Sequence, residues 1–511
     1  MCDELGLAGL PNGADVFSSP VVSAVAIGSV DALIVAVYLI GTVALGIWLG
    51  RGQKNNRDYF LGGHQLPTWS LLLSIVATET STVTFLSVPG KSYVDGGNFT
   101  FLQLAMGYIV GRLAIVVILL PAYFRGDMLS AYQVLEQRFG LTTRRVASLV
   151  FLIARNLADG LRLFLSAWAL NIAIGLDFMT CIIAMTVITA IYSCAGGVKS
   201  VVWNDCIQFA VYMAGAFATI WVVTSLLPGG WSQIVEFGKQ TGRWQLFDFD
   251  PSLTKGGITF WSGVLGGGFL SLATHGVDQM IVQRYLCAKN QTAAGWALAL
   301  SGFVVFAQFA FFLLIGVALA CFYSNFGNGP EKGDEAFMTF VVGHMSVGLK
   351  GLILAAVLAA TMSNLSASFN SSASALMGDW LQLLLPNLND RKQLQIARLL
   401  TLASAVAHAT VAIAAYKMGV ERAIVDIVLG IAGFSIGLLL GLYGLGMIAP
   451  RTSQAVALTA FAAGAVATFS VAKWTDVNSY WYTLVGSSTI VVVGLALRFV
   501  FDHRRAGTPN S

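Results

Sequence analysis

Long apolar runs recur along the whole chain, and most of them extend over 20 residues or more. A run of this length spans the hydrocarbon core of a bilayer as a helix. Only 11% of the residues are charged, whereas soluble domains carry roughly 25%. Helices and closed barrels are the two structures that satisfy the backbone in lipid, and these runs are too continuous for barrel strands. The sequence therefore predicts an all-α polytopic membrane protein.

We predict about 13 transmembrane helices, at residues 29–50, 66–88, 98–124, 145–171, 177–194, 202–227, 258–281, 294–323, 347–380, 394–416, 422–448, 453–472 and 480–501. With this number of spans, the loops on one side carry 17 Lys and Arg residues and those on the other side carry 9. Because cytoplasmic loops are enriched in basic residues, the N-terminus is expected outside and the C-terminus in the cytoplasm. The predicted location is the plasma (inner) membrane.

Several other classes of protein are disfavoured by the sequence. The six cysteines stand singly, which predicts neither a metal site nor a disulfide framework. Asp3 and Glu4 lie where a signal peptide would have basic residues. The basic residues of the loops set the orientation of the protein in the membrane, so we do not interpret them as a binding surface for nucleic acid. No obligate protein partner is evident from the sequence. No paired acid and base or nucleophile constellation indicates an enzyme.

A hydroxyl- and amide-rich stretch at residues 359–374 interrupts the apolar pattern. At helical spacing Ser363, Ser366, Asn370 and Ser374 share one face of the helix. Small polar side chains are costly in hydrocarbon, so this face is expected to point toward protein or a water-filled cavity. Two interpretations remain open for this segment alone: close helix–helix packing, or an ion-binding site.

Two of the predicted spans look broken. Residues 78–84 place hydroxyls and the Glu79 carboxylate at mid-membrane depth, and Gly266–Gly268 precede a polar stretch in the span at 258–281. These spans lie five segments apart, as expected for inverted repeats whose broken helices meet at the ligand site. We therefore divide the chain into a tail, first helix and inner loop (1–65), a first repeat (66–227), an outside loop (228–257), a second repeat (258–448) and two further helices with a tail (449–511).

Three ordered motifs resemble the sodium:solute symporter family, which includes sodium-coupled sugar, sialic acid, proline, iodide and vitamin carriers. They are RDYFLGG at Arg57–Gly63, GGVKSVVWNDCIQ at Gly196–Gln208 and DQMIVQRYLCAKN at Asp278–Asn290. The similarity extends from about residue 30 to 448. It implies a leucine-transporter-type fold with two inverted five-helix repeats and sodium-coupled alternating access, with Na⁺ as the coupling ion.

The resemblance also implies a sodium site. Its ligands would be the carbonyls of Ala77, Thr80 and Ala360 and the side chains of Ser363 and Asn364. Oxygen ligands suit a hard cation, and an unwound helix supplies free carbonyls. Asn364 departs from the family, which usually has Ser or Thr there.

Some family members hold a second sodium near an acidic residue, here Asp205, and Ser363 and Ser366 fit that site. Ala367 replaces a hydroxyl found in members with two ions, which favours one sodium. The alternative for Asp205 is a carboxylate stabilised by a helix N-terminus.

By position in the family, six residues are predicted to contact the solute: Glu79, Ser81, Thr84, Gln103, Ser271 and Thr274. A lone buried carboxylate must pair, protonate or hold a ligand, so Glu79 either binds solute or pairs with an intramembrane arginine. The expected internal partners lie on the face of Arg155, Asp159 and Arg162. Ala158 stands where sialic acid carriers have a carboxylate-binding arginine, which argues against that solute.

The sequence thus predicts a sodium-coupled symporter that imports a small polar solute such as a sugar, carboxylate or amino acid. The alternative is a sodium-leak channel or solute sensor that has kept the transporter fold. Substrate-dependent sodium current separates these possibilities, because a channel conducts without solute and a sensor moves neither.

Overall fold

The structure is a computed structural model that describes residues 28–125, 128–385, 387–419 and 422–506. Within these ranges the secondary structure is helical, apart from one isolated bridge between Leu66 and Ala288. The main helices of the predicted spans are α1 (Ser29–Leu49), α3 (Thr68–Glu79), α4 (Thr82–Tyr93), α5 (Leu102–Ile118), α8 (Leu141–Ile174), α9 (Phe178–Leu226), α11 (Gly267–Gly276), α13 (Gln291–Phe326), α15 (Leu349–Leu376), α17 (Asp390–Lys417), α18 (Arg422–Ile448), α19 (Gln454–Trp474) and α20 (Tyr482–Ala506). The remaining elements are α2 (Asn56–Leu61), η2 (Gly62–His64), α6 (Leu120–Tyr123), α7 (Gln133–Phe139), α10 (Gly230–Gln240), η3 (Ser262–Gly266), α12 (Gln279–Leu286), α14 (Gly333–His344), η4 (Met377–Leu381), α16 (Gln382–Leu384) and η5 (Ser479–Trp481).

All 13 predicted spans fall on helices of this structure. Within the described residues, seven helices are long and apolar enough to cross a membrane, and the bent pair α3–α4 raises that number to eight. Others are shorter, as α5 is, or carry several charges, as α8 does. The polytopic all-α architecture is confirmed, and the number 13 stays a prediction.

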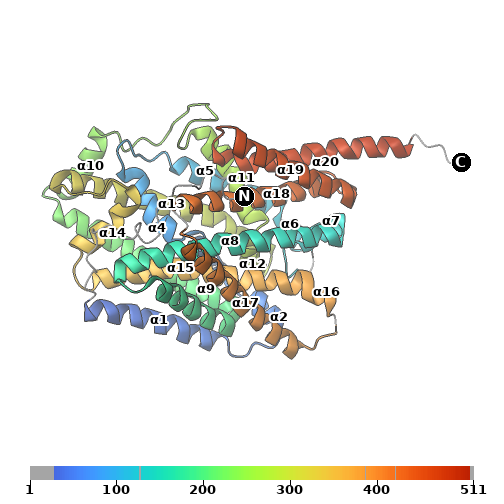
Figure 1. The fold of residues 1–511 in the computed structure, drawn as a ribbon, viewed down its shortest axis with the longest axis horizontal. Coiled ribbons are helices and arrows are strands. Elements are labelled where there is room, and N and C mark those ends of the chain that lie inside the picture. The colour runs from blue at the N-terminus through green and yellow to red at the C-terminus, as the bar shows by residue number, and fades with distance from the viewer. Residues whose placement is uncertain (1–27, 126–127, 386, 420–421, 507–511) are drawn as a thin grey trace.

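The helices form an elongated bundle with connecting elements at its two ends. In Figure 1, α10 and α14 lie at the left end, and α7 and α16 lie at the right end. The predicted outside loops contain α10 and α14, whereas the predicted inside loop between spans three and four contains α7. The alternation of loops expected from the basic residues is therefore compatible with the arrangement of the helices.

Helix α9 contains two of the predicted spans in one continuous element. The turn between them is at Gly197, whose φ of 53° is in the left-handed region that favours glycine. A Cβ at this position would lie 2.5 Å from the carbonyl oxygen of Tyr59, so the close approach of the first inner loop also requires glycine. The GG motif thus serves the packing of α2 against the turn in α9.

Helix α15 is the central element of the bundle. In the span Leu349–Leu384, 94% of the most apolar window is buried, against 17% for α1 and 28% for α19. Its small residues allow close contact with α9, α8, α17 and α1 on different sides. The hydroxyl-rich stretch at 359–374 therefore lies at the centre of the protein, where every polar atom must find a partner or a ligand.

The first predicted break is present, and the second lies elsewhere than predicted. Helices α3 and α4 meet at a bend of 64° around Thr80 and Ser81. Gly266–Gly268, by contrast, have helical geometry, with Gly266 at the end of η3 and Gly267 at the start of α11. A Cβ on Gly267 would lie 2.9 Å from Leu104 O of α5, and a Cβ on Gly266 would lie 2.6 Å from Tyr480 O, so these glycines serve close packing. The interruption in this span comes about ten residues later, at Val277 and Asp278, between α11 and α12.

Candidate functional site

The bend between α3 and α4 changes the hydrogen-bond partners of the backbone. In a continuous helix the N–H of Ser81 would donate to Ala77 O, and the N–H of Thr84 would donate to Thr80 O. Here Ser81 N donates to Glu79 O at 3.1 Å, and Thr84 N donates to Ser81 Oγ at 3.3 Å. The carbonyls of Ala77 and Thr80 thereby lose their helical donors. These are the two carbonyls predicted to bind sodium.

Helix α15 lies directly against this bend. Asn364 Nδ2 donates to Thr78 O at 3.0 Å, and Thr82 is hydrogen-bonded through its hydroxyl to Thr361 and to Val357 O, the latter at 3.0 Å. Asn364 Oδ1 is buried and has no hydrogen-bond partner among the described residues. A buried unpaired amide oxygen is costly unless it has a ligand. The arrangement fits a cation held by oxygen atoms from the bend and from Ala360, Ser363 and Asn364 of α15.

Asp205 is fully buried in α9 beside this site. Its donors are Ser74 Oγ at 2.5 Å, Ser363 Oγ at 2.6 Å, Thr78 Oγ1 at 3.4 Å and Arg284 Nη2 at 3.4 Å. Arg284 thus supplies a positive charge where a second sodium would supply one. Ser366 Oγ donates to Ser363 O at 3.1 Å rather than to Asp205. Asp205 also lies two turns beyond the turn at Gly197, so stabilisation by a helix N-terminus does not explain it.

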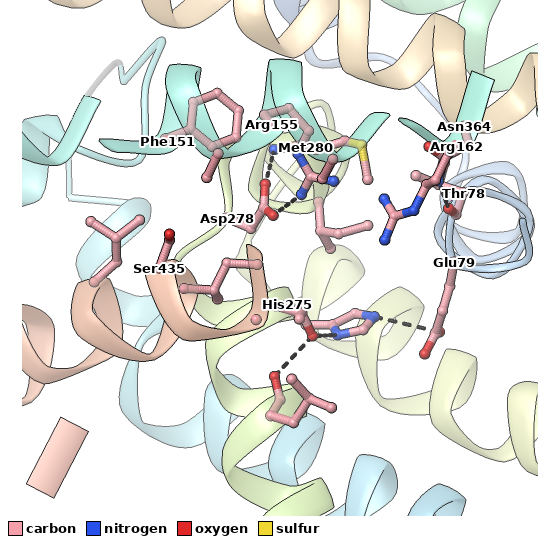
Figure 2. A pocket seen from close by; sticks show the side chains of 18 of the residues that line it. Thr78, Glu79, Phe151, Arg155, Arg162, His275, Asp278, Met280, Asn364 and Ser435 are labelled. Carbon is pink, nitrogen blue, oxygen red and sulfur yellow. Dashed lines mark hydrogen bonds and ion pairs between the residues drawn. The ribbon is translucent and has the colours of Figure 1, made fainter. Parts of the chain in front are cut away.

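A cavity of about 270 Å³ opens beside the bend. Figure 2 shows Glu79 and Asn364 on one side of it, Ser435 of α18 on the other, and Arg155 and Arg162 of α8 above His275. The remaining lining residues are Thr78, Tyr108, Phe151, Ala154, Ala158, Leu270, Thr274, Asp278, Met280, Ile281, Gly433, Ile436 and Leu439. Residues of both broken spans and of α8, α15 and α18 therefore line one cavity.

Glu79 pairs with Arg112 of α5, which differs from the predicted partners on α8. Arg112 Nη1 also donates to Ser301 Oγ at 2.7 Å, and His275 Nε2 lies 3.5 Å from Glu79 Oε2. Helical periodicity identified the charged face of α8 but not the arginine that lies across the bend. The Arg112–Glu79–His275 cluster connects the end of α3 with α5 and with the end of α11.

The charged residues of α8 form a separate chain of ion pairs. Arg155 pairs with Asp278 and lies 3.4 Å from Asp159 Oδ2, and Arg162 Nη1 donates to Asp159 Oδ1 at 2.6 Å. The Arg162 side chain is 29% exposed, and its Nε and Nη2 make no hydrogen bond among the described residues. Figure 2 shows this guanidinium pointing into the cavity. Ala158 also lines the cavity, one turn earlier on the same face.

The six residues predicted to contact solute divide into three groups. Glu79 and Thr274 line the cavity; Thr274 Oγ1 also contacts His275 Nδ1 at 2.9 Å. Thr84 lines a second cavity, and Ser81 is 3.3 Å from Thr84 Oγ1 without lining either one. Ser271 donates to Tyr108 O at 3.1 Å and serves the packing of α11 on α5.

Gln103 binds the loop before α11 and does not line either cavity. Its Nε2 donates to Ile258 O at 3.2 Å, and its Oε1 accepts from Asp248 N at 3.1 Å. Within this loop the pKa of Asp248 is lowered, chiefly because Lys255 Nζ donates to its carboxylate at 2.7 Å. The position of Gln103 at the bundle end indicates a structural role in this conformation.

The second cavity, of about 230 Å³, lies on the other side of Glu79. Its lining residues are Glu79, Thr84, Ser87, Val88, Lys91, Phe101, Tyr108 and Phe309. Glu79 and Tyr108 line both cavities, so these two side chains separate them. Sequence reasoning missed Tyr108 and Ser435. A single arginine in the span at 98–124 indicated a network or snorkelling role for Arg112, but not its pairing with Glu79.

Known proteins support this assignment of the fold. Residues 59–464 match the sodium:solute symporter family. The chain is 29% identical to sodium-coupled monocarboxylate transporter 2 of Danio rerio over 90% of its length and 73% of that protein. It is 28% identical to the sodium/sialic acid symporter NanT of Aliivibrio fischeri, over 93% of the chain and 94% of the relative.

A solved structure agrees with these relatives. The substrate-bound, outward-open Na⁺-coupled sialic acid symporter superposes with a TM-score of 0.83 at 25% identity and covers 92% of this chain and 97% of its own. The predicted leucine-transporter-type fold is thereby confirmed. None of these relatives is named as a channel, a sensor or an enzyme, so the alternative of a leak channel or sensor finds no support. The chain is a sodium-coupled symporter, and it belongs to the sodium:solute symporter family.

Proposed function

We propose that this symporter imports a small organic carboxylate together with one sodium ion. The observation that carries the proposal is the guanidinium of Arg162, which is held on one side by Asp159 and is free toward the cavity on the other. A guanidinium matches the planar geometry of a carboxylate and binds it through two parallel hydrogen bonds. Glu79 would not repel the anion, because Arg112 and His275 already offset its charge.

The size of the cavity and the relatives support a small solute. A cavity of about 270 Å³ is below the range of about 300–1,000 Å³ typical of sites for drug-sized ligands. Relatives transport monocarboxylates, sialic acid and iodide, all of which are anions. Ala158 leaves no cation at the position of the sialic acid carriers' arginine, whereas Arg162 supplies one a turn further along the same helix. We therefore favour a small carboxylate over a sugar or an amino acid.

For the ion, we propose the site formed by the carbonyls of Ala77, Thr80 and Ala360 with Ser363 and Asn364. Support comes from the two carbonyls that lose their helical donors and from the unpaired Asn364 Oδ1. We propose that Asp205 stays paired with Arg284 rather than holding a second sodium. The membrane would be the plasma (inner) membrane with the N-terminus outside, as the distribution of basic residues indicates.

Replacing Arg162 by glutamine is expected to raise the KM for carboxylate uptake about thirtyfold or more, since truncating one partner of a buried charge pair costs roughly 2–5 kcal/mol. The measurement is sodium-dependent uptake of lactate, glucose and alanine by proteoliposomes that contain the purified protein. Arg145→Gln on the same helix, outside the cavity, is the matched control. Equal KM values in Arg162→Gln and the wild type, or uptake of glucose alone, would contradict the carboxylate assignment.

Transport of one sodium with one monocarboxylate is expected to be electroneutral. One sodium entering through a potential of about 100 mV releases about 2.3 kcal/mol, and the accompanying anion cancels this energy. Imposing an inside-negative potassium diffusion potential on the same proteoliposomes should leave the uptake rate unchanged. Faster uptake with a measured ratio of two sodium ions per solute would show that a second cation is transported and would contradict the proposal of one sodium ion. Faster uptake at a ratio of one would show that the solute is neutral.

A further inference from the structure

A groove of about 430 Å³ lies at the surface of the bundle, and none of its lining residues lines either transport cavity. Three elements form it: the end of α1, the middle of α9 just before the turn at Gly197, and the first third of α17. Its lining residues are Ile47, Gly50, Arg51, Ile191, Cys194, Ala195 and Arg398. These three segments are predicted to be the cytoplasmic ends of their spans, where a bilayer presents its headgroups.

The groove carries positive charge without a matching carboxylate. Arg51 and Arg398 are its two charged residues, and both are exposed. Neither arginine forms an ion pair within the described part of the chain, and no lining residue is acidic. A guanidinium at a membrane interface binds phosphate oxygens through paired charge-assisted hydrogen bonds. The groove is therefore complementary to a ligand with a negative phosphate.

Its floor is held by close packing between α1 and α9. A Cβ on Gly50 would lie 2.1 Å from Ala195 O, so the two backbones meet at a distance that glycine alone permits. Gln53 Nε2 donates to Gly196 O at 2.7 Å, and Cys194 Sγ lies 3.7 Å from Arg398 O. These contacts fix the segments that carry the arginines, although the arginine side chains themselves face outward.

The remaining walls are apolar and partly exposed. Ile47 is 45% exposed and Ile191 is 44% exposed, and both lie toward the middle of the membrane from the arginines along their helices. Acyl chains would cover these isoleucines while a phosphate lies at the guanidinium groups. We propose that this groove binds the headgroup of an anionic phospholipid, with its acyl chains along α1 and α9. Basic pockets between transmembrane helices at the cytoplasmic surface are known to recognise such headgroups.

The test uses the full-length protein in nanodiscs of phosphatidylcholine alone or with phosphatidylglycerol. Native mass spectrometry counts the phosphatidylglycerol molecules retained by the wild type, Arg51→Gln, Arg398→Gln and the double variant. A basic residue near the membrane surface contributes about 1 kcal/mol to the binding of anionic lipid, which is about fivefold in affinity. The affinity for phosphatidylglycerol should therefore fall about fivefold in each single variant and about thirtyfold in the double variant. Arg451→Gln, an exposed arginine on the same predicted side but outside the groove, is the control and should bind as the wild type does.

Thermal unfolding gives a second measurement that does not depend on transport. Phosphatidylglycerol should raise the Tm of the wild type and the control, and the rise should be lost in the double variant. Equal retention of phosphatidylglycerol by the wild type and the double variant would overturn the proposal. Inorganic phosphate that raises the Tm equally in phosphatidylcholine nanodiscs would show a site for a free anion and would overturn the lipid assignment.

Discussion

Replacing Arg112 by leucine is expected to destabilise the protein by about 3–5 kcal/mol, the usual effect of removing one partner of a buried ion pair. The Arg112 side chain has no exposed surface, and its partner Glu79 is 15% exposed. Without the arginine, His275 Nε2, at 3.5 Å from Glu79 Oε2, is the one ion-pair partner of the carboxylate that remains among the described residues. The measurement is thermal unfolding of the purified variant in detergent, with Arg451→Gln as a surface control.

The double variant Glu79→Gln, Arg112→Leu separates this effect from a loss of packing. Because it removes both charges, we expect it to recover most of the stability lost in Arg112→Leu. A double variant as unstable as Arg112→Leu would show that the arginine acts through its volume rather than its charge. Glu79→Gln alone leaves Arg112 buried and unpaired, so it is also expected to be less stable than the wild type. If Glu79 instead binds solute, that variant keeps its stability and changes KM.

Replacing Asn364 by leucine should raise the sodium concentration for half-maximal uptake by about tenfold or more, because a hydrogen bond or ligand contact to a charged group contributes about 1.5–3 kcal/mol. The substitution removes Oδ1, the buried oxygen without a partner, and it also removes the donor to Thr78 O. Uptake is measured at saturating solute as a function of the sodium concentration. The maximal uptake rate should change by a smaller factor than the sodium concentration for half-maximal uptake.

Ser371→Ala is the matched control for this variant. Ser371 is buried in α15, as Asn364 is, and its hydroxyl donates within the helix to Ser368 O at 3.2 Å. Its removal leaves the bend between α3 and α4 untouched, so its sodium dependence should equal that of the wild type. If Asn364→Leu and Ser371→Ala give the same sodium dependence, the proposed ion site is wrong.

The sequence predicted the bend and the polar stretch that form the proposed sodium site, but not the neighbours of the charged residues around it. Polar residues at helical spacing predicted that this part of α15 faces protein rather than lipid, and residues 359–374 of α15 are indeed buried on all sides. The run from Thr78 to Thr84 indicated a break that the structure contains. Both signals are local, since they depend on side chains within a few residues of one another. They required no knowledge of which helices pack together.

The partners across the bundle could not be found in this way. Glu79 and Arg112 are separated by 33 residues. Both α5 and α8 contain arginines, and the sequence alone could not decide which of them pairs with the Glu79 carboxylate. Gly266–Gly268 suggested an interruption because glycine disfavours helix, but close packing of Gly267 on Leu104 and of Gly266 on Tyr480 overrides that preference. Gln103 and Ser271 looked like ligand residues by position, and the structure uses both of them for contacts between backbone segments.

Two side chains, those of Glu79 and Tyr108, separate the two cavities. Glu79 cannot rotate freely, because Arg112 and His275 hold its carboxylate. A solute that moves from the cavity at Lys91 to the cavity at Arg162 must pass Glu79 and Tyr108. Glu79 is held by Arg112 of α5 and His275 of α11, so we expect that the path opens only if these contacts are released. The carbonyls of Ala77 and Thr80 flank this same glutamate. A sodium ion bound to those carbonyls would therefore also restrain Glu79, which the solute must pass on its way between the cavities. The same group of atoms would then hinder transport of the ion without the solute and of the solute without the ion.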